Sequence, residues 1–245
     1  MAKSKSKTKS QRRTSPPPPP PPQQPLPSLL RQACKFFGTT AGLDLTLRLF
    51  QGLVIISAKA ADEVVATRSF IASAQLDLAR RYLRFFVLLD CIHNVLDTIA
   101  KEHASLAYKT LDLVEWSCLL MYFALENLTM LHDMKIHVLP WYRPVLVEAN
   151  KFWLYAILAS IARTVIRRAG LLFSRSPARS SKREQQQQQQ QHPPPPPLRR
   201  LVIDALDLCL PASFIGWVAI DDVTIGCIMT LSTLLVWRDV WAKAQ

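Results

Sequence analysis

Three arginines, at positions 80, 81 and 84, stand among leucines and aromatic residues in the stretch LARRYLRFF, residues 78–86. A guanidinium group binds carboxylates and phosphates through its fixed fork of N–H donors. At about 100° per residue, the arginines and Asp77 share one narrow side of a helix, and apolar side chains fill much of the rest. This pattern is typical of a helix that lies in a membrane interface with its basic stripe near lipid phosphates.

The residues predicted to bind lipid combine this stripe with its apolar flank: Arg80, Arg81, Arg84, Leu76, Tyr82, Leu83 and Phe86. The alternative is packing inside the protein, because four acidic residues fall on one stripe of a later predicted helix. These are Asp112, Glu115, Glu126 and Asp133. The arginines could pair with these carboxylates instead of with phosphates, and the sequence pattern leaves both interpretations open.

Other residue types that could do chemistry lack the spacing for it. His132 and His137 are five residues apart, so they do not share a helix face as two metal ligands would. The five cysteines show neither a disulfide nor a metal-binding spacing, and no glycine-rich phosphate loop is present. We therefore expect no enzymatic activity, no metal and no cofactor.

The net charge of +12 is concentrated in two segments. Residues 1–28 hold six Lys/Arg and no acid, and residues 167–200 hold eight Lys/Arg and one acid, so the rest of the chain is nearly neutral. A nucleic-acid-binding domain carries its basic excess on its folded part. The distribution therefore argues against nucleic acid as a partner and favours anionic lipid head groups.

Composition divides the chain into four regions. They are a disordered basic and poly-Pro tail (1–28), a helical membrane-associated region (29–172), a low-complexity Arg/Gln/Pro linker (173–200) and a hydrophobic C-terminal hairpin (201–245). Helical spacing of apolar residues predicts helices at about residues 40–65, 72–92, 105–132 and 145–172. Pro140 and Pro144 separate the last two. The expected fold class is an all-α, membrane-associated helical bundle with an amphipathic helix.

The C-terminal region predicts a pair of membrane-spanning helices. Residues 201–220 and 223–242 form two apolar legs that meet at Asp221 and Asp222, and each is about 30 Å long as a helix, the thickness of a hydrocarbon core. Trp237 and Trp241 suit the interface, and the flanking basic residues should hold both chain ends in the cytosol. The alternative is a hairpin buried in protein, which Pro211 and the charges at the ends favour. No uncharged run in residues 29–172 is long enough to span alone.

Several short motifs occur in a particular order along the chain: DLTLRLFQ (44–51), ARRYLR (79–84), ENL (126–128), KFWL (151–154), LDLCLP (206–211) and VTIG (223–226) followed by Leu231-Ser232. In order and spacing they resemble the peroxin 11 family of peroxisomal membrane proteins, which elongate and divide peroxisomes. Met229-Thr230 stands where that family has a second glycine in its C-terminal run.

The resemblance implies an integral protein of the peroxisomal membrane whose amphipathic helix inserts into the cytosolic leaflet and promotes peroxisome proliferation and fission. It also implies a homo-oligomer that gathers the fission machinery, including a dynamin-like GTPase. A channel for small metabolites, also proposed for the family, is the alternative, with Asp204, Asp207 and Arg163 as candidate residues of the path. A soluble adaptor that uses its proline runs is a third possibility.

Overall fold

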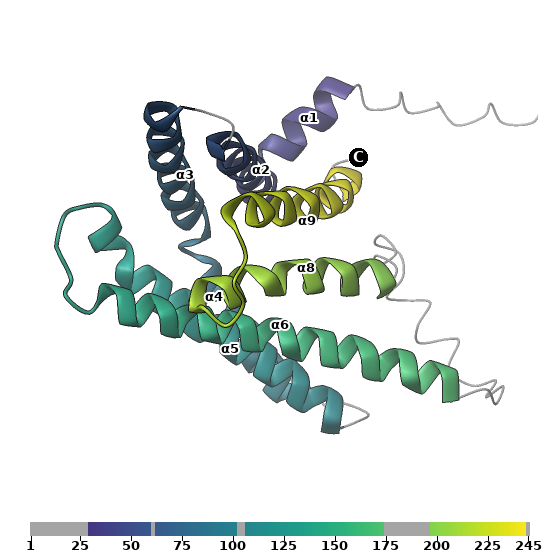
Figure 1. The fold of residues 1–245 in the computed structure, drawn as a ribbon. Helices are drawn as coiled ribbons and strands as arrows, with labels where there is room; N and C mark the ends of the chain where they lie inside the picture. Colours follow the sequence, from purple (N-terminus) through teal and green to yellow (C-terminus); the bar gives the residue numbers. More distant parts are fainter. Residues whose placement is uncertain (1–28, 60–61, 102–105, 174–196, 244–245) are drawn as a thin grey trace, which may run out of the picture.

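The computed structural model describes residues 29–59, 62–101, 106–173 and 197–243, and these residues form eight α-helices (Figure 1). The helices are α1 (Leu29–Phe37), α2 (Thr40–Lys59), α3 (Glu63–Arg84), α4 (Val87–Ala100), α5 (Leu106–Asp133), α6 (Tyr142–Phe173), α8 (Pro197–Ile215) and α9 (Asp222–Lys243). The all-α prediction is confirmed. The predicted tail 1–28 and most of the predicted linker, residues 174–196, lie outside the described residues.

Two of the predicted helices are each divided in the structure. The one predicted over residues 40–65 ends at Lys59, and α3 begins at Glu63 after Asp62, whose backbone is extended (φ −61°, ψ 157°). The one predicted over residues 72–92 breaks at Phe85 and Phe86, which separate α3 from α4. There the ladder tightens, because Phe85 N donates to Tyr82 O (3.3 Å) and Leu89 N donates to Phe86 O (3.0 Å). Neither glycine nor proline marks these breaks in the sequence.

The break predicted between α5 and α6 is confirmed. Asp133 ends α5, Tyr142 begins α6, and Pro144 lies in the first turn of α6, where a missing N–H costs nothing. His132 holds this connection together, since its Nδ1 accepts from the Leu139 N–H (3.0 Å) and its ring stacks on Tyr142 with centroids 4.0 Å apart.

The helices pack in two groups that α8 and α9 join (Figure 1). In one group, α2 lies between α3 and α9; in the other, α5 packs against α4 and α6. The second group buries an apolar cluster of Cys91, Tyr122, Phe123 and Ala149 from α4, α5 and α6. The groups also meet where the C-terminal end of α3 approaches α5.

The C-terminal helical hairpin is present: α8 begins and ends earlier than the predicted leg 201–220, and α9 covers the whole predicted leg 223–242. Gly216, with φ +87°, lies directly after α8, in a conformation that glycine adopts without strain. Asp221 caps α9 by accepting a hydrogen bond from the Thr224 N–H (3.2 Å). The legs contact each other, but α8 packs more extensively on α6 and α9 more extensively on α2. The hairpin is therefore an integral part of the bundle.

Candidate membrane-interaction site

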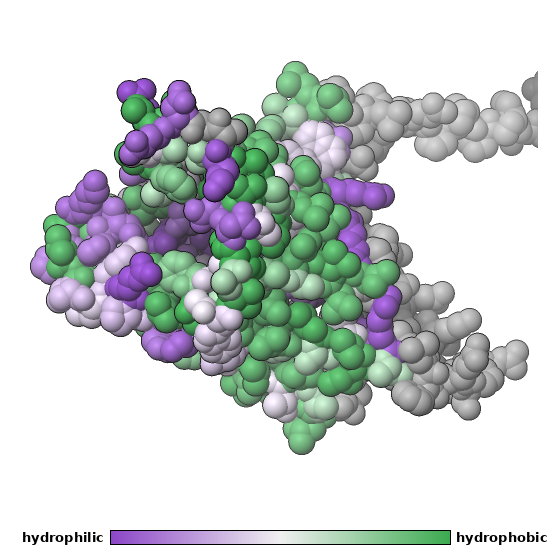
Figure 2. All heavy atoms as spheres, in the orientation of Figure 1, coloured by the Kyte–Doolittle hydropathy of each residue, from purple (hydrophilic) through white to green (hydrophobic). Residues whose placement is uncertain are grey.

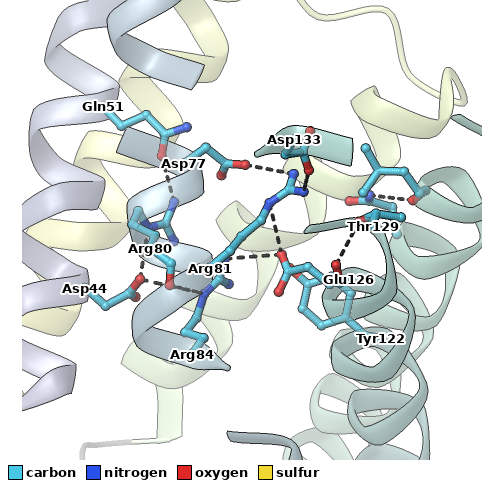
Figure 3. Close-up of polar contacts among 12 residues, drawn as sticks. Asp44, Gln51, Asp77, Arg80, Arg81, Arg84, Tyr122, Glu126, Thr129 and Asp133 are labelled. Atoms are coloured by element: carbon cyan, nitrogen blue, oxygen red, sulfur yellow. Dashed lines mark hydrogen bonds and ion pairs between the residues drawn. The ribbon is translucent and has the colours of Figure 1, made fainter. Parts of the chain in front are cut away.

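Arg80 faces α2 from the last turns of α3 (Figure 3). Its Nε donates to Asp44 (3.0 Å) and its Nη1 to the side-chain oxygen of Gln51 (2.8 Å). The Arg80 residue is 8 % exposed, and burial lowers the pKa of its guanidinium. An arginine still keeps its proton under these conditions, so Asp44 and Gln51 provide the polar partners that a buried cation requires.

Arg81 and Arg84 face α5. Arg81 lies 2.8 Å from Asp77 on its own helix, 2.5 Å from Asp133 and 3.7 Å from Glu126 on α5. Arg84 lies 3.3 Å from Glu126 and 3.8 Å from Asp44. We call these three arginines and the four carboxylates that surround them the arginine network; it links α2, α3 and α5 (Figure 3).

Glu126 is the most buried acid of the arginine network, with 5 % of its side chain exposed. The Tyr122 hydroxyl donates to it at 2.8 Å, and burial raises the pKa of that hydroxyl, which stays protonated as a donor. The packing alternative drawn from the sequence therefore describes Arg81 and Arg84, which pair with Glu126 and Asp133. The pattern did not indicate the partner of Arg80, because Asp44 lies on a different helix.

The apolar residues predicted to bind lipid divide into two pairs. Leu76 and Leu83 are half-buried, whereas Tyr82 is 46 % exposed and Phe86 is 70 % exposed. With the arginines turned inward, the outer side of α3 is partly apolar and carries Ile71 as well as Tyr82.

This exposed apolar surface continues onto α4. Leu89, Ile92, Leu96 and Ile99 recur at a spacing of three and four residues, and all are exposed. We call these exposed side chains, Ile71, Tyr82 and Phe86 together with Leu89, Ile92, Leu96 and Ile99, the outer apolar stripe. Soluble monomers rarely leave so many neighbouring large apolar side chains uncovered.

A second charged cluster joins α5, α6 and α8. Arg163 pairs with Asp112 and with Glu115 (2.7 Å), and Asp204 accepts from Ser160 (2.8 Å). Burial raises the pKa of the Glu115 carboxyl. The acidic stripe predicted on the third helix is therefore shared between the two clusters. Asp112 and Glu115 pair with Arg163, whereas Glu126 and Asp133 pair with arginines of α3. The sequence singled out Arg163 only as a candidate for transport.

Helices α2 and α9 approach each other closely at two glycines. A Cβ at Gly226 would lie 2.8 Å from Ile56 Cγ1 and 3.0 Å from Gly52 O, and a Cβ at Gly52 would lie 2.6 Å from Thr230 Oγ1. One glycine on each helix therefore achieves the contact, although α9 has no second glycine in this run. One helical turn before Gly52 on α2, Arg48 bonds to Asp207 and to Ser232 Oγ (3.0 Å).

Three helical segments are long and apolar enough to cross a membrane: Thr40–Lys59, Tyr142–Ala169 and Asp222–Lys243. The first two correct the expectation that residues 29–172 contain no such segment, because a spanning helix tolerates a few charged residues that end an uncharged run. The predicted leg at residues 201–220 is not among the three, because the helix there runs from Pro197 to Ile215 and so includes Arg199 and Arg200 as well as Asp204 and Asp207. Figure 2 shows hydrophobic residues gathered over α8 and α9.

Residues 30–241 match the model of one protein family, described as Peroxisomal biogenesis factor 11 (PEX11). No curated protein and no solved structure matches the chain. Among the described residues, no three His, Cys, Asp or Glu side chains are placed to hold a metal ion.

Proposed function

Because this chain belongs to the Peroxisomal biogenesis factor 11 (PEX11) family, we propose that it remodels and elongates the peroxisomal membrane and so promotes peroxisome proliferation and fission. The family places it among peroxisome biogenesis factors, and its three membrane-capable helices suit a membrane protein. The remodelling step is assigned to α3 together with the start of α4.

The observation that supports this assignment is the outer apolar stripe. Its side chains, including Tyr82 and Phe86, are exposed in the folded chain, so they can enter a leaflet without any rearrangement of the core. Inserted side chains expand one leaflet relative to the other, which favours curvature. We place both chain ends in the cytosol, because basic segments flank the membrane-capable helices. From that side, the stripe can enter only the cytosolic leaflet.

The arginines of the network can bind two kinds of anionic group, namely the carboxylates within the protein and the phosphates of lipids. In the folded chain, Arg81 and Arg84 are neutralised by Glu126 and Asp133, and this holds α3 against α5. A surface of anionic lipids offers phosphates in place of these carboxylates, and each arginine near such a surface contributes about 1 kcal/mol. Exchange of carboxylate for phosphate would let α3 turn and settle deeper, with Leu76 and Leu83 joining the stripe.

Membrane remodelling requires many inserted helices close together. We therefore include homo-oligomers in the proposal, and the elongated membrane would gather the fission machinery, including a dynamin-like GTPase.

Liposome tubulation tests the proposal. The full-length protein is reconstituted into liposomes with and without anionic lipid, and tubules are counted by electron microscopy. We expect tubules with the native chain and few with Tyr82→Ser/Phe86→Ser, which removes exposed apolar groups without opening the core. Leu106→Ser, which changes a leucine outside the stripe that is more exposed than either residue (79 %), is the control and should tubulate normally. Equal tubulation by all three would contradict the assignment, and loss of the protein from the membrane pellet in alkaline carbonate would favour a soluble adaptor.

A metabolite channel is the second candidate, because one cavity lies between the two helix groups. Its volume is about 420 Å³, and its walls include polar residues such as Arg48, Gln51 and Asn150 as well as apolar ones such as Phe214. Asp207, a candidate from the sequence, bonds to Arg48 at this cavity. Conductance in planar bilayers that is lost in Asp207→Ala would favour the channel, and a silent bilayer would favour remodelling alone.

A further inference from the structure

The first helix of the described chain is clamped onto the end of the last. Phe36 of α1 is fully buried between two indole rings of α9, with centroids 4.5 Å from Trp237 and 5.3 Å from Trp241. One helical turn earlier, the Gln32 side-chain N–H donates to the Trp241 carbonyl at 3.0 Å. The aromatic and the polar contact together fix both the position and the rotation of α1 on α9.

The two tryptophans identify the level of the bilayer at which α1 lies. Trp237 and Trp241 stand in the last two turns of α9, one of the three membrane-capable helices. Tryptophan concentrates at membrane–water interfaces, where its ring is held between acyl chains and head groups. A helix packed against these two rings therefore lies at the boundary of the bilayer when α9 spans it.

Part of the exposed surface of α1 is apolar, beside the exposed Arg31 and Lys35. Leu30, Cys34 and Phe37 follow each other at intervals of four and three residues, so they lie on one stripe, and all three are exposed. Leu29, which is 76 % exposed, adjoins them. Figure 2 shows hydrophobic residues on the outer surface of α1. At nine residues, or about 13 Å, α1 is too short to span a membrane, so it can bury this stripe only by lying along the surface.

We propose that α1 is a membrane-interface anchor, whose Leu30–Cys34–Phe37 stripe enters the head-group and acyl boundary of the leaflet that holds the tryptophan end of α9. The anchor ties the start of α2 to the end of α9 within one leaflet. The inference rests on the proposed function in one respect, namely that α9 resides in a membrane. It adds a lipid-contacting surface separate from α3 and the outer apolar stripe.

Protection of Cys34 reports directly on the buried stripe. The full-length protein is placed in lipid nanodiscs, whose two faces are both open to water, and treated with a charged, membrane-impermeant maleimide. The extent of modification at Cys34 is read by peptide mass spectrometry over time. The anchor predicts slow modification in the native chain and modification at least about fivefold faster in Leu30→Ser/Phe37→Ser.

Two further variants complete the test. Leu106→Ser removes an equally exposed leucine elsewhere and should leave Cys34 protected. Phe36→Ala removes the side chain that packs against the tryptophans and should also expose Cys34, because α9 positions the anchor. If Cys34 reacts as fast in the native chain as in Leu30→Ser/Phe37→Ser, the anchor is refuted.

Liposome tubulation, measured on the same preparations, separates the two proposals. Tubulation by a native chain whose Cys34 is unprotected would refute the anchor and leave membrane remodelling intact. A chain that neither enters nanodiscs nor tubulates liposomes would refute both.

Discussion

Glu126→Gln tests the arginine network most sharply, because it removes one charge and keeps the shape. In the native chain Glu126 faces Arg84 at 3.3 Å and Arg81 at 3.7 Å, with 5 % of its side chain exposed. Removing one member of a buried ion pair commonly costs about 3–5 kcal/mol, since the remaining charge loses its partner. Here the cost should be smaller, because Arg81 keeps Asp77 and Asp133, and the glutamine can still accept from Tyr122.

We therefore expect Glu126→Gln to lower the free energy of unfolding by about 2–3 kcal/mol. For a protein of this size, that corresponds to a fall in melting temperature of roughly 4–12 °C. The melting temperature can be measured in detergent micelles by circular dichroism. The same variant should bind anionic liposomes more tightly in a flotation assay, because Arg81 and Arg84 lose a competing carboxylate.

The matched control is Glu148→Gln. Among the described residues, Glu148 pairs with Lys151 alone, on its own helix at 2.6 Å, and its side chain is 55 % exposed, so its contribution should be close to zero. A Glu126→Gln variant that melts and binds liposomes like Glu148→Gln would refute the description of the network as a lock on α3. Weaker liposome binding would refute the proposed exchange of carboxylate for phosphate.

Three further predictions concern the core. Gly226→Ala should destabilise the bundle by about 1–3 kcal/mol in thermal unfolding, because its Cβ would meet Ile56 at 2.8 Å, and an unchanged melting temperature would contradict the close crossing. Burial raises the pKa of Glu115, so its contribution to stability is largest below the ordinary glutamate pKa and is lost as pH rises through the raised value. Glu115→Gln should therefore reduce the fall in melting temperature as pH rises above the ordinary glutamate range, and an unaltered slope would show that other groups cause it. Burial raises the pKa of the Cys91 thiol to about 11, whereas Cys34 is exposed. In detergent at pH 8, a thiol reagent should therefore modify Cys34 and spare Cys91 until the chain unfolds. Equal rates of modification at the two cysteines would contradict the buried position of Cys91.

Helical periodicity was enough to predict the all-α class, the break before α6 and the C-terminal hairpin. Pro140 and Pro144 forbid a continuous helix, and the Asp221-Asp222 pair interrupts an apolar run. The breaks before α3 and after Arg84 could not be predicted in this way. No glycine or proline lies there, and the chain changes direction because α3 packs back along α2.

The charged residues mark the limit of sequence reasoning for the site. A helical projection places Arg80, Arg81 and Arg84 on one stripe, but it contains no information about which helix will face that stripe. Asp44 and Glu126 come from different helices, so their meeting is set by tertiary packing. The same limit applies to α8, whose charges look like the ends of a membrane span in the sequence. In the fold, Asp204 and Asp207 face polar partners on α6 and α2.

Imaging of peroxisomes tests the central claim most directly. A fluorescent fusion of the full-length chain is expressed together with a peroxisomal membrane marker, beside Tyr82→Ser/Phe86→Ser and the Leu106→Ser control, and peroxisome length and number are counted. The native chain and the control should colocalise with the marker and yield longer and more numerous peroxisomes, and the stripe variant should colocalise without this effect. A diffuse cytosolic signal, or unchanged peroxisomes on expression of the native chain, would contradict the account.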